Sequence, residues 1–409
     1  MIEPSAYKVI FLAQLIYLIS ISRFFVKYFS HVDHGGLVIQ GFLTQSLTKK
    51  RVSFIFAIWN IALIFIFFSS GAAVIISSLL CFFFSRYFFI YLRYKSIGRG
   101  NGAPGFMSYW TMTYAIAFQF LEINNINNGS VVLLMKWDFA IIMLSACIYK
   151  YKTGYLKGRG IEYGLKNEMW TWAHRIFQKF PNNSFIFRIL NFLSIIVEFL
   201  VFLFLLLPGF DSYAAILLAL MFLFLFAFVR LGTLPITMFA LSYVYFGASG
   251  YDYKINSPMF LNLLCVSYGL LLIFSSTWNW IYFLKVETPR NLAFILEKAY
   301  AITGSIIWSV FTARLTENLI LIYKVARGQT TGTKTIDFGV HSGISLTTIA
   351  TFTDYFPEAT AEQERRFKIY LKSLYGDVSD KEILFYKMRA SGNKLEMNLI
   401  KTFKFYSKS

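Results

Sequence analysis

The sequence predicts an α-helical polytopic membrane protein of about nine transmembrane helices with a small C-terminal α+β surface domain. Hydrophobic residues make up 57% of the chain and aromatic residues 20%, and the mean hydropathy is +0.56. The apolar residues gather in runs of membrane-span length. After residue 285 charges appear every few residues. We therefore divide the chain into a membrane domain at 1–290, which contains a polar re-entrant segment at 149–180, and a membrane-surface domain at 291–409.

Nine apolar runs define the expected spans. No small-residue cleavage site follows the first run, so we expect it to be retained as a span. Residues 69–71 leave room only for a tight helical hairpin, and the eighth run is short for a full span. An odd number of spans places the amino terminus and the C-terminal domain on opposite faces of the membrane. The runs are 7–29, 53–69, 72–92, 106–123, 131–151, 185–207, 213–229, 235–246 and 259–284.

The net charge of +18 comes mostly from basic residues in the loops between these runs. Anionic lipid headgroups, in a lipid bilayer, are therefore a simpler partner than nucleic acid. The three cysteines lie in apolar runs and indicate buried thiols rather than disulfides. His31 and His34 are close in sequence but have no further ligands nearby, so we expect a hydrated loop pair and no metal site.

The polar segment 149–180 concentrates charge between two apolar runs. Its glycines interrupt any long helix, so the chain can fold back toward the protein and form a site. The alternative is a basic cytoplasmic loop held by headgroups. Within this segment Lys157 is the best candidate base, because a buried lysine loses its charge readily. The alternative is that Lys157 is exposed like Lys166 and Lys179, whose removal we expect to change little.

Glu198 lies near the middle of the run 185–207. An ionisable group at that depth costs about 3 kcal/mol on insertion scales, so a partner or a role is expected. Lys157, Arg188 and Arg230 are candidate partners. A structural ion pair and a functional carboxylate are both consistent with this position.

The sequence of the C-terminal domain predicts both strands and a helix. Residues 316–325 are rich in β-forming residues, and 334–338 can pair back with them. Residues 359–375 have the apolar spacing and the N-cap of an amphipathic helix. The segments 382–389 and 395–405 flank Ser391-Gly392-Asn393, which indicates a hairpin.

Several of these residues occur in a family order. Gly154 and Lys157 form a G-x-x-K step, Glu162 and Gly164 follow, then Trp170, and Gly304 and Trp308 precede the β-rich tail. In this order, with about nine spans, the chain resembles the vitamin K-dependent γ-carboxylase superfamily. The membrane part of that superfamily is called the horizontally transferred transmembrane (HTTM) domain, and its members include the sporulation-delaying-protein B type. Two family histidines have no counterpart here.

The resemblance implies roles for particular residues. Lys157 corresponds to the catalytic base and Glu198 to the acidic residue of the next span. The leading aromatic is Tyr149 or Tyr151, and His174 is the histidine nearest the lysine. The remaining residues expected around the cavity or substrate, in addition to Tyr151 and His174, are Gly154, Glu162, Trp170 and Arg230.

The resemblance also implies a function. We expect a bacterial cytoplasmic (inner) membrane protein that modifies or matures a secreted peptide or protein at the exoplasmic face. The implied activity is γ-carboxylase-like, of the carbon–carbon lyase type, with a reduced quinone of the vitamin K type as cofactor. The alternative is a non-catalytic membrane subunit of an export, toxin-production or assembly complex. Loop charges favour a cytoplasmic position for 149–180, whereas the family orientation, which we adopt, is exoplasmic for this segment and for the C-terminal domain.

Overall fold

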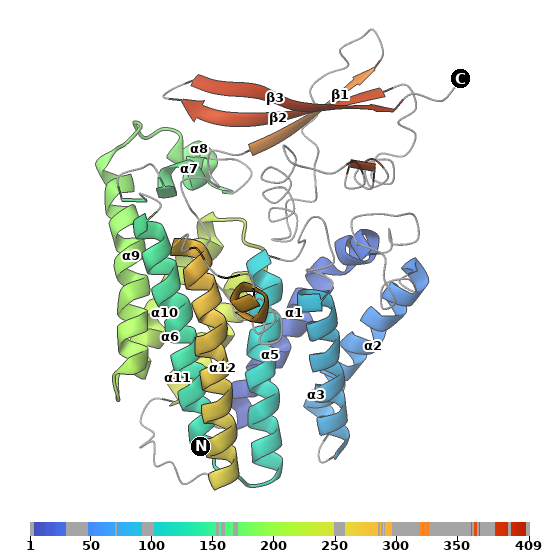
Figure 1. Cartoon of the computed structure of the whole chain (residues 1–409), viewed down its shortest axis with the longest axis vertical. Helices are drawn as coiled ribbons and strands as arrows, with labels where there is room; N and C mark the ends of the chain where they lie inside the picture. The colour runs from blue at the N-terminus through green and yellow to red at the C-terminus, as the bar shows by residue number, and fades with distance from the viewer. Residues whose placement is uncertain are drawn as a thin grey trace.

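The computed structural model describes most of the membrane domain and part of the C-terminal domain. The described residues are 4–29, 48–69, 72–91, 102–152, 155–156, 160–166, 171–248, 258–284, 287, 289, 291–296, 319–326, 361, 364–365, 368, 381–391 and 394–405. Helices stand side by side in a bundle, and a sheet lies beyond one end of it (Figure 1).

Nine long helical segments of the described chain coincide with the nine apolar runs. They are α1 (Pro4–Phe29), α2 (Lys49–Phe68), α3 (Ala72–Ser85) with its continuation η2 (Arg86–Tyr91, a π-helix), α5 (Gly102–Ile123), α6 (Gly129–Lys152), α9 (Phe185–Leu206), α10 (Asp211–Phe228), α11 (Leu234–Ala248) and α12 (Met259–Leu284). Five segments of the described chain are long and apolar enough to cross a membrane: α2, α3 with η2, α6, α9 and α10. The chain is a helical membrane protein.

Local sequence sets where these helices begin and end. The Thr48 side chain accepts a hydrogen bond from the Arg51 N–H at 3.3 Å and caps α2. Ser69 then ends α2, and α3 packs back against it as the predicted hairpin. Between α9 and α10, Gly209 has a φ of +82°, a backbone conformation that favours glycine. Each break coincides with a change from apolar to polar or glycine-containing sequence.

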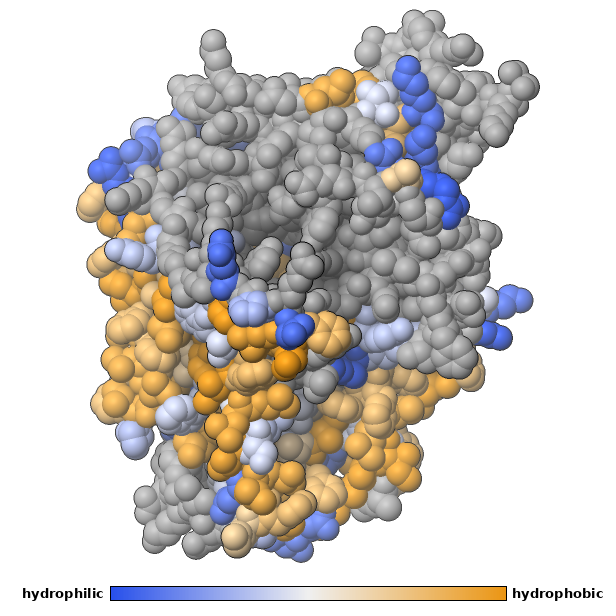
Figure 2. Space-filling view, in the orientation of Figure 1, coloured by the Kyte–Doolittle hydropathy of each residue, from blue (hydrophilic) through white to orange (hydrophobic). Residues whose placement is uncertain are grey.

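The centre of the bundle is formed by α5 and α11, which pack against each other and against α1. Most of α11 is buried, including Met238, Leu241 and Val244. A helix enclosed by other helices need not match the full thickness of the bilayer, and this accounts for the short eighth run. Outer helices instead expose large apolar side chains such as Phe54 and Phe226. Hydrophobic side chains cover much of the bundle surface below the sheet (Figure 2), as expected of a surface that faces lipid.

The sheet has three antiparallel strands in the order β1 (Leu319–Ala326), β2 (Lys381–Ser391) and β3 (Lys394–Phe405). The predicted hairpin around Ser391 is confirmed: Ser391 pairs with Lys394, and the register continues to Lys381 opposite Phe405. β1 pairs with β2. The partner predicted for it, 334–338, lies outside the described residues, as does most of the predicted helix 359–375.

The helices run along the bundle and bring particular segments to the end that carries the sheet. Helix α1 begins at the end of the bundle away from the sheet, whereas α6 and α12 end near it (Figure 1). The segment that joins α6 to α9 contains two short helices, α7 (Gly160–Lys166) and α8 (His174–Phe177). They lie at the end of α9 nearest the sheet, so the polar segment and the sheet share one end of the molecule.

Candidate functional site

A buried ion pair joins α6 to α9 where the polar segment begins. The Lys150 Nζ lies 2.5 Å from the Glu198 Oε1, and the two side chains are only 6% and 4% exposed. Glu198 therefore has the basic partner predicted for a carboxylate at this depth. However, Arg188 is exposed and Arg230 lies over Trp172, so neither of these two candidate partners holds it. Lys150 is the partner of Glu198 instead, because it lies on the face of α6 that packs against α9.

Glu198 uses only part of its hydrogen-bonding capacity. Its Oε1 accepts from Lys150, whereas its Oε2 is buried and has no hydrogen-bond partner among the described residues. A buried carboxylate oxygen without a donor is costly and calls for an explanation, such as a catalytic role or a bound water or ion. The pair therefore differs from a fully satisfied structural ion pair.

Tyr155 covers this pair from the polar segment. Its N–H donates to the Lys150 carbonyl at 3.0 Å, and the Lys150 Nζ lies 5.5 Å from the centre of its ring. Burial raises the pKa of the Tyr155 hydroxyl, although a hydrogen bond with Ser194 of α9 opposes this shift. The phenol therefore stays neutral. A Cβ atom at Gly160 would overlap the Tyr155 ring, so glycine is required for this close approach.

The polar segment is fastened to α9 by two further contacts. The Asn191 side chain is buried, and its Oδ1 accepts from the Ile161 N–H at 2.8 Å, which fixes the start of α7. The Glu162 Oε2 accepts from the Asn183 N–H at 2.9 Å and fixes the turn before α9. These bonds hold α7 across the end of α9.

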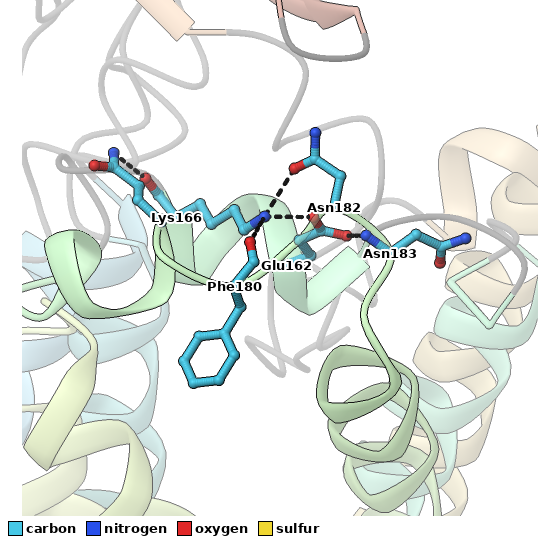
Figure 3. Close-up of polar contacts among 6 residues, drawn as sticks. Glu162, Lys166, Phe180, Asn182 and Asn183 are labelled. Atoms are coloured by element: carbon cyan, nitrogen blue, oxygen red, sulfur yellow. Dashed lines mark hydrogen bonds and ion pairs between the residues drawn. The ribbon is translucent and has the colours of Figure 1, made fainter.

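Lys166 is the centre of a second, fully bonded network (Figure 3). Its Nζ donates to the Glu162 Oε1 at 2.8 Å, the Phe180 carbonyl at 3.0 Å and the Asn182 Oδ1 at 2.8 Å. An ammonium group has three donors, so this lysine is saturated. The prediction that Lys166 is an exposed loop lysine was wrong, because the return of the chain toward α9 brings residues 180–183 against its end. Lys179 is exposed as expected.

The other predicted site residues lie in different places. Tyr151, which was expected at the cavity, follows Lys150 by one helical step and is 72% exposed. The His174 Nδ1 lies 3.3 Å from the Thr171 carbonyl. The guanidinium carbon of Arg230 lies 4.3 Å from the centre of the Trp172 ring. The backbone N–H of Trp172 donates to the Phe228 carbonyl at 3.0 Å.

Five residues of the family order lie outside the described parts of the chain. They are Gly154, Lys157 and Trp170 of the polar segment, and Gly304 and Trp308 before the β-rich tail. Glu198 and Glu162, which are described, belong to separate networks. The structure thus brings Glu198 together with Lys150 and Tyr155 rather than with the other described members of the predicted set.

Two further ionisable groups lie on α6. The Lys136 Nζ pairs with the Asp211 Oδ1 of α10 at 2.6 Å, and both side chains are buried. Asp138 accepts from Trp110 and Tyr114 of α5. Their occurrence in an apolar run is the signal that identifies them, because charged residues within spans are rare. Within the described part of the chain, no three histidine, cysteine or acidic side chains come close enough to hold a metal ion.

Comparison with protein-family models, with curated proteins and with solved structures found no match to this chain. The interpretation of the site therefore depends on its own geometry.

Proposed function

We propose that this membrane protein matures a secreted peptide or protein, and that the Lys150–Glu198 pair is its ionisable centre. The observation that carries the proposal is that the buried Glu198 Oε2 has no hydrogen-bond donor among the residues that the structure describes. A lysine and a carboxylate in contact in a medium of low dielectric can exchange a proton at small cost, since neutral and ionised forms of the pair become comparable in free energy. The unused oxygen is the point at which a substrate or cofactor hydroxyl would bind.

The resemblance to the vitamin K-dependent γ-carboxylases supports a more specific form of this proposal. Lys157 would then be the base and Glu198 its acidic partner in a γ-carboxylase-like reaction of the carbon–carbon lyase type. A reduced quinone fits the donor set, because its hydroxyl can donate to the Glu198 Oε2. When bound, it would supply the acidic hydroxyl that a base deprotonates. Glu198, Lys150 and Tyr155 are the residues that would orient it and exclude water.

We also propose that the site opens to the exoplasmic side of a bacterial cytoplasmic membrane. The end of α6, the polar segment and the sheet lie at one end of the molecule (Figure 1). A substrate that reaches the site from that side would meet the sheet first. This common location supports a shared role in binding a secreted chain.

The test is mass spectrometry of secreted peptides from cells that carry the protein or its variants. Glu198→Gln keeps the shape of the side chain but removes its charge, and Lys157→Ala removes the proposed base. We expect both to abolish a defined mass change or processing step, with the protein still present in the membrane. Lys179→Ala is the matched control, because Lys179 is exposed.

A non-catalytic membrane subunit of an export, toxin-production or assembly complex is the second candidate. It is favoured by a specific observation: two buried ion pairs fix α6 to α9 and to α10, as expected of a rigid scaffold. In that case Glu198→Gln would leave every secreted mass unchanged and would instead release partner subunits during purification. That result would overturn the maturation proposal.

A further inference from the structure

Asp138 forms a second buried polar centre, on α6 but separate from the Lys150–Glu198 pair. Its Oδ2 accepts from the Trp110 Nε1 at 2.7 Å and from the Tyr114 hydroxyl at 2.9 Å. The two donors are one helical turn apart on α5 and so share a face. Asp138 is 6% exposed and lies within the candidate span 129–151.

No basic side chain of the described residues lies within ion-pair distance of Asp138. Lys136, two residues away, points to α10 and is held by Asp211. Arg86 of η2 donates to the Tyr109 hydroxyl at 3.0 Å. Burial favours the neutral form of the Asp138 carboxyl group, whereas two donors on one of its oxygens favour the ionised form. The ionised form inside a membrane span requires a cation, and no described side chain within ion-pair distance of Asp138 supplies one.

The surroundings of Asp138 are aromatic. The Trp110 ring lies 4.8 Å from the Tyr114 ring and 5.6 Å from the Phe139 ring, centre to centre. Phe139 in turn lies 5.9 Å from Tyr245 of α11. Tyr268 of α12 interacts electrostatically with Asp138. Helices α5, α6, α11 and α12 thus contribute aromatic rings to one acidic centre.

Helix α12 is held close enough to α6 to bring Tyr268 to this centre. The Ser130 hydroxyl donates to the Asn262 Oδ1 at 2.5 Å. About two turns further along α12, Gly269 faces Leu134, and a Cβ at this glycine would lie 3.5 Å from the leucine side chain. The Tyr268 side chain is partly exposed, unlike Trp110 and Tyr114. The α12 side is therefore the side from which a ligand can approach.

We propose that Asp138 and the aromatic residues around it bind a primary ammonium group carried on an apolar chain. The carboxylate supplies a charge-assisted hydrogen bond, and the faces of tryptophan and tyrosine rings attract a cation further. An apolar chain on the amine would lie in the hydrocarbon beside α12. This proposal does not rest on the maturation function.

The test uses the full-length protein in nanodiscs of phosphatidylcholine and calorimetric titration with n-butylammonium chloride. We expect saturable binding of butylammonium but not of n-butanol, which has a similar size and no charge. Asp138→Asn, which keeps an acceptor for Trp110, should weaken binding about tenfold or more, as expected for the loss of a charged hydrogen-bond partner. Glu122→Gln, a change in the last turn of the same α5, should leave binding unchanged.

Two results would overturn the proposal. One is equal binding of butylammonium and butanol by the unchanged protein, a comparison that requires no variant to fold. The other is an infrared band of a protonated carboxylic acid that disappears in Asp138→Asn, because a neutral Asp138 would have a proton in place of the ammonium group. Repetition in phosphatidylethanolamine nanodiscs distinguishes the source of the amine: competition there would identify a lipid headgroup, and its absence would favour a peptide amine.

Discussion

Two lysine–glutamate pairs lie close together in this protein and differ in how completely they are bonded. In the Glu162–Lys166 pair both carboxylate oxygens accept hydrogen bonds, and the ammonium group has three acceptors. In the Lys150–Glu198 pair one carboxylate oxygen is buried and has no donor in the described part of the chain. The first pair is complete within the protein, whereas the second has capacity for another molecule. Hydrogen-bond saturation, rather than burial alone, separates a structural pair from a candidate site here.

The largest effect is expected when the Lys150–Glu198 pair loses one member. Lys150→Met leaves a buried carboxylate without its cation and should lower the free energy of unfolding by about 3–5 kcal/mol. The double change Lys150→Met with Glu198→Leu removes both charges and should restore most of this stability. Thermal unfolding in detergent, followed by size-exclusion chromatography with fluorescence detection, measures the stability of the single and of the double variant.

If the double variant is as unstable as Lys150→Met, the cost comes from lost packing and not from an uncompensated charge. In that case the pair cannot be treated as an electrostatic unit. Restored stability without the secreted mass change would separate the role of the pair in the fold from its role in function.

A smaller effect is expected in the saturated pair. Lys166→Ala removes hydrogen bonds from a charged group that is still 16% exposed, so we expect a loss of about 1.5–3 kcal/mol. The loss should be local, because the network joins α7 to the turn before α9. Hydrogen exchange of residues 160–166 and 180–184 should increase, with little change in α6. An increase spread evenly over the bundle would show that the two pairs are not independent.

The difference between these pairs also explains what the sequence could reveal. Glu162 and Lys166 are four residues apart, and their pairing follows from helix periodicity alone. Glu198 and Lys150 are 48 residues apart, so the partner depends on how α6 packs against α9. The apolar runs and the hairpin at Ser391 are local signals, and the helices and the hairpin formed where they predicted. The exposure of Tyr151 and the bonds from Lys166 to Phe180 and Asn182 depend on how distant segments pack, which no local pattern encodes.

The contact that closes the site should be sensitive to a single methyl group. Gly160→Ala would place a Cβ against the Tyr155 ring and should cost about 1–3 kcal/mol through overpacking. Tyr155→Leu, which removes the ring, should reduce the cost of the alanine. A double-mutant cycle of these two changes measures the coupling. Additive effects would mean that Gly160 is required for backbone reasons and not for the tyrosine.

The smallest effect is expected at Tyr151, and it sharpens the comparison because Tyr151 is next to Lys150 in sequence. Successive residues of an α-helix point about 100° apart, so the neighbour of a buried lysine can face the surroundings of the protein. Tyr151 is 72% exposed at the end of α6, where an aromatic side chain suits a membrane interface. Tyr151→Ala should therefore change the free energy of unfolding by no more than about 0.5 kcal/mol and leave the secreted masses unaltered. A loss of the mass change as complete as that in Glu198→Gln would mean that the substrate contacts the outer face of α6, and the centre of the site would have to be moved there.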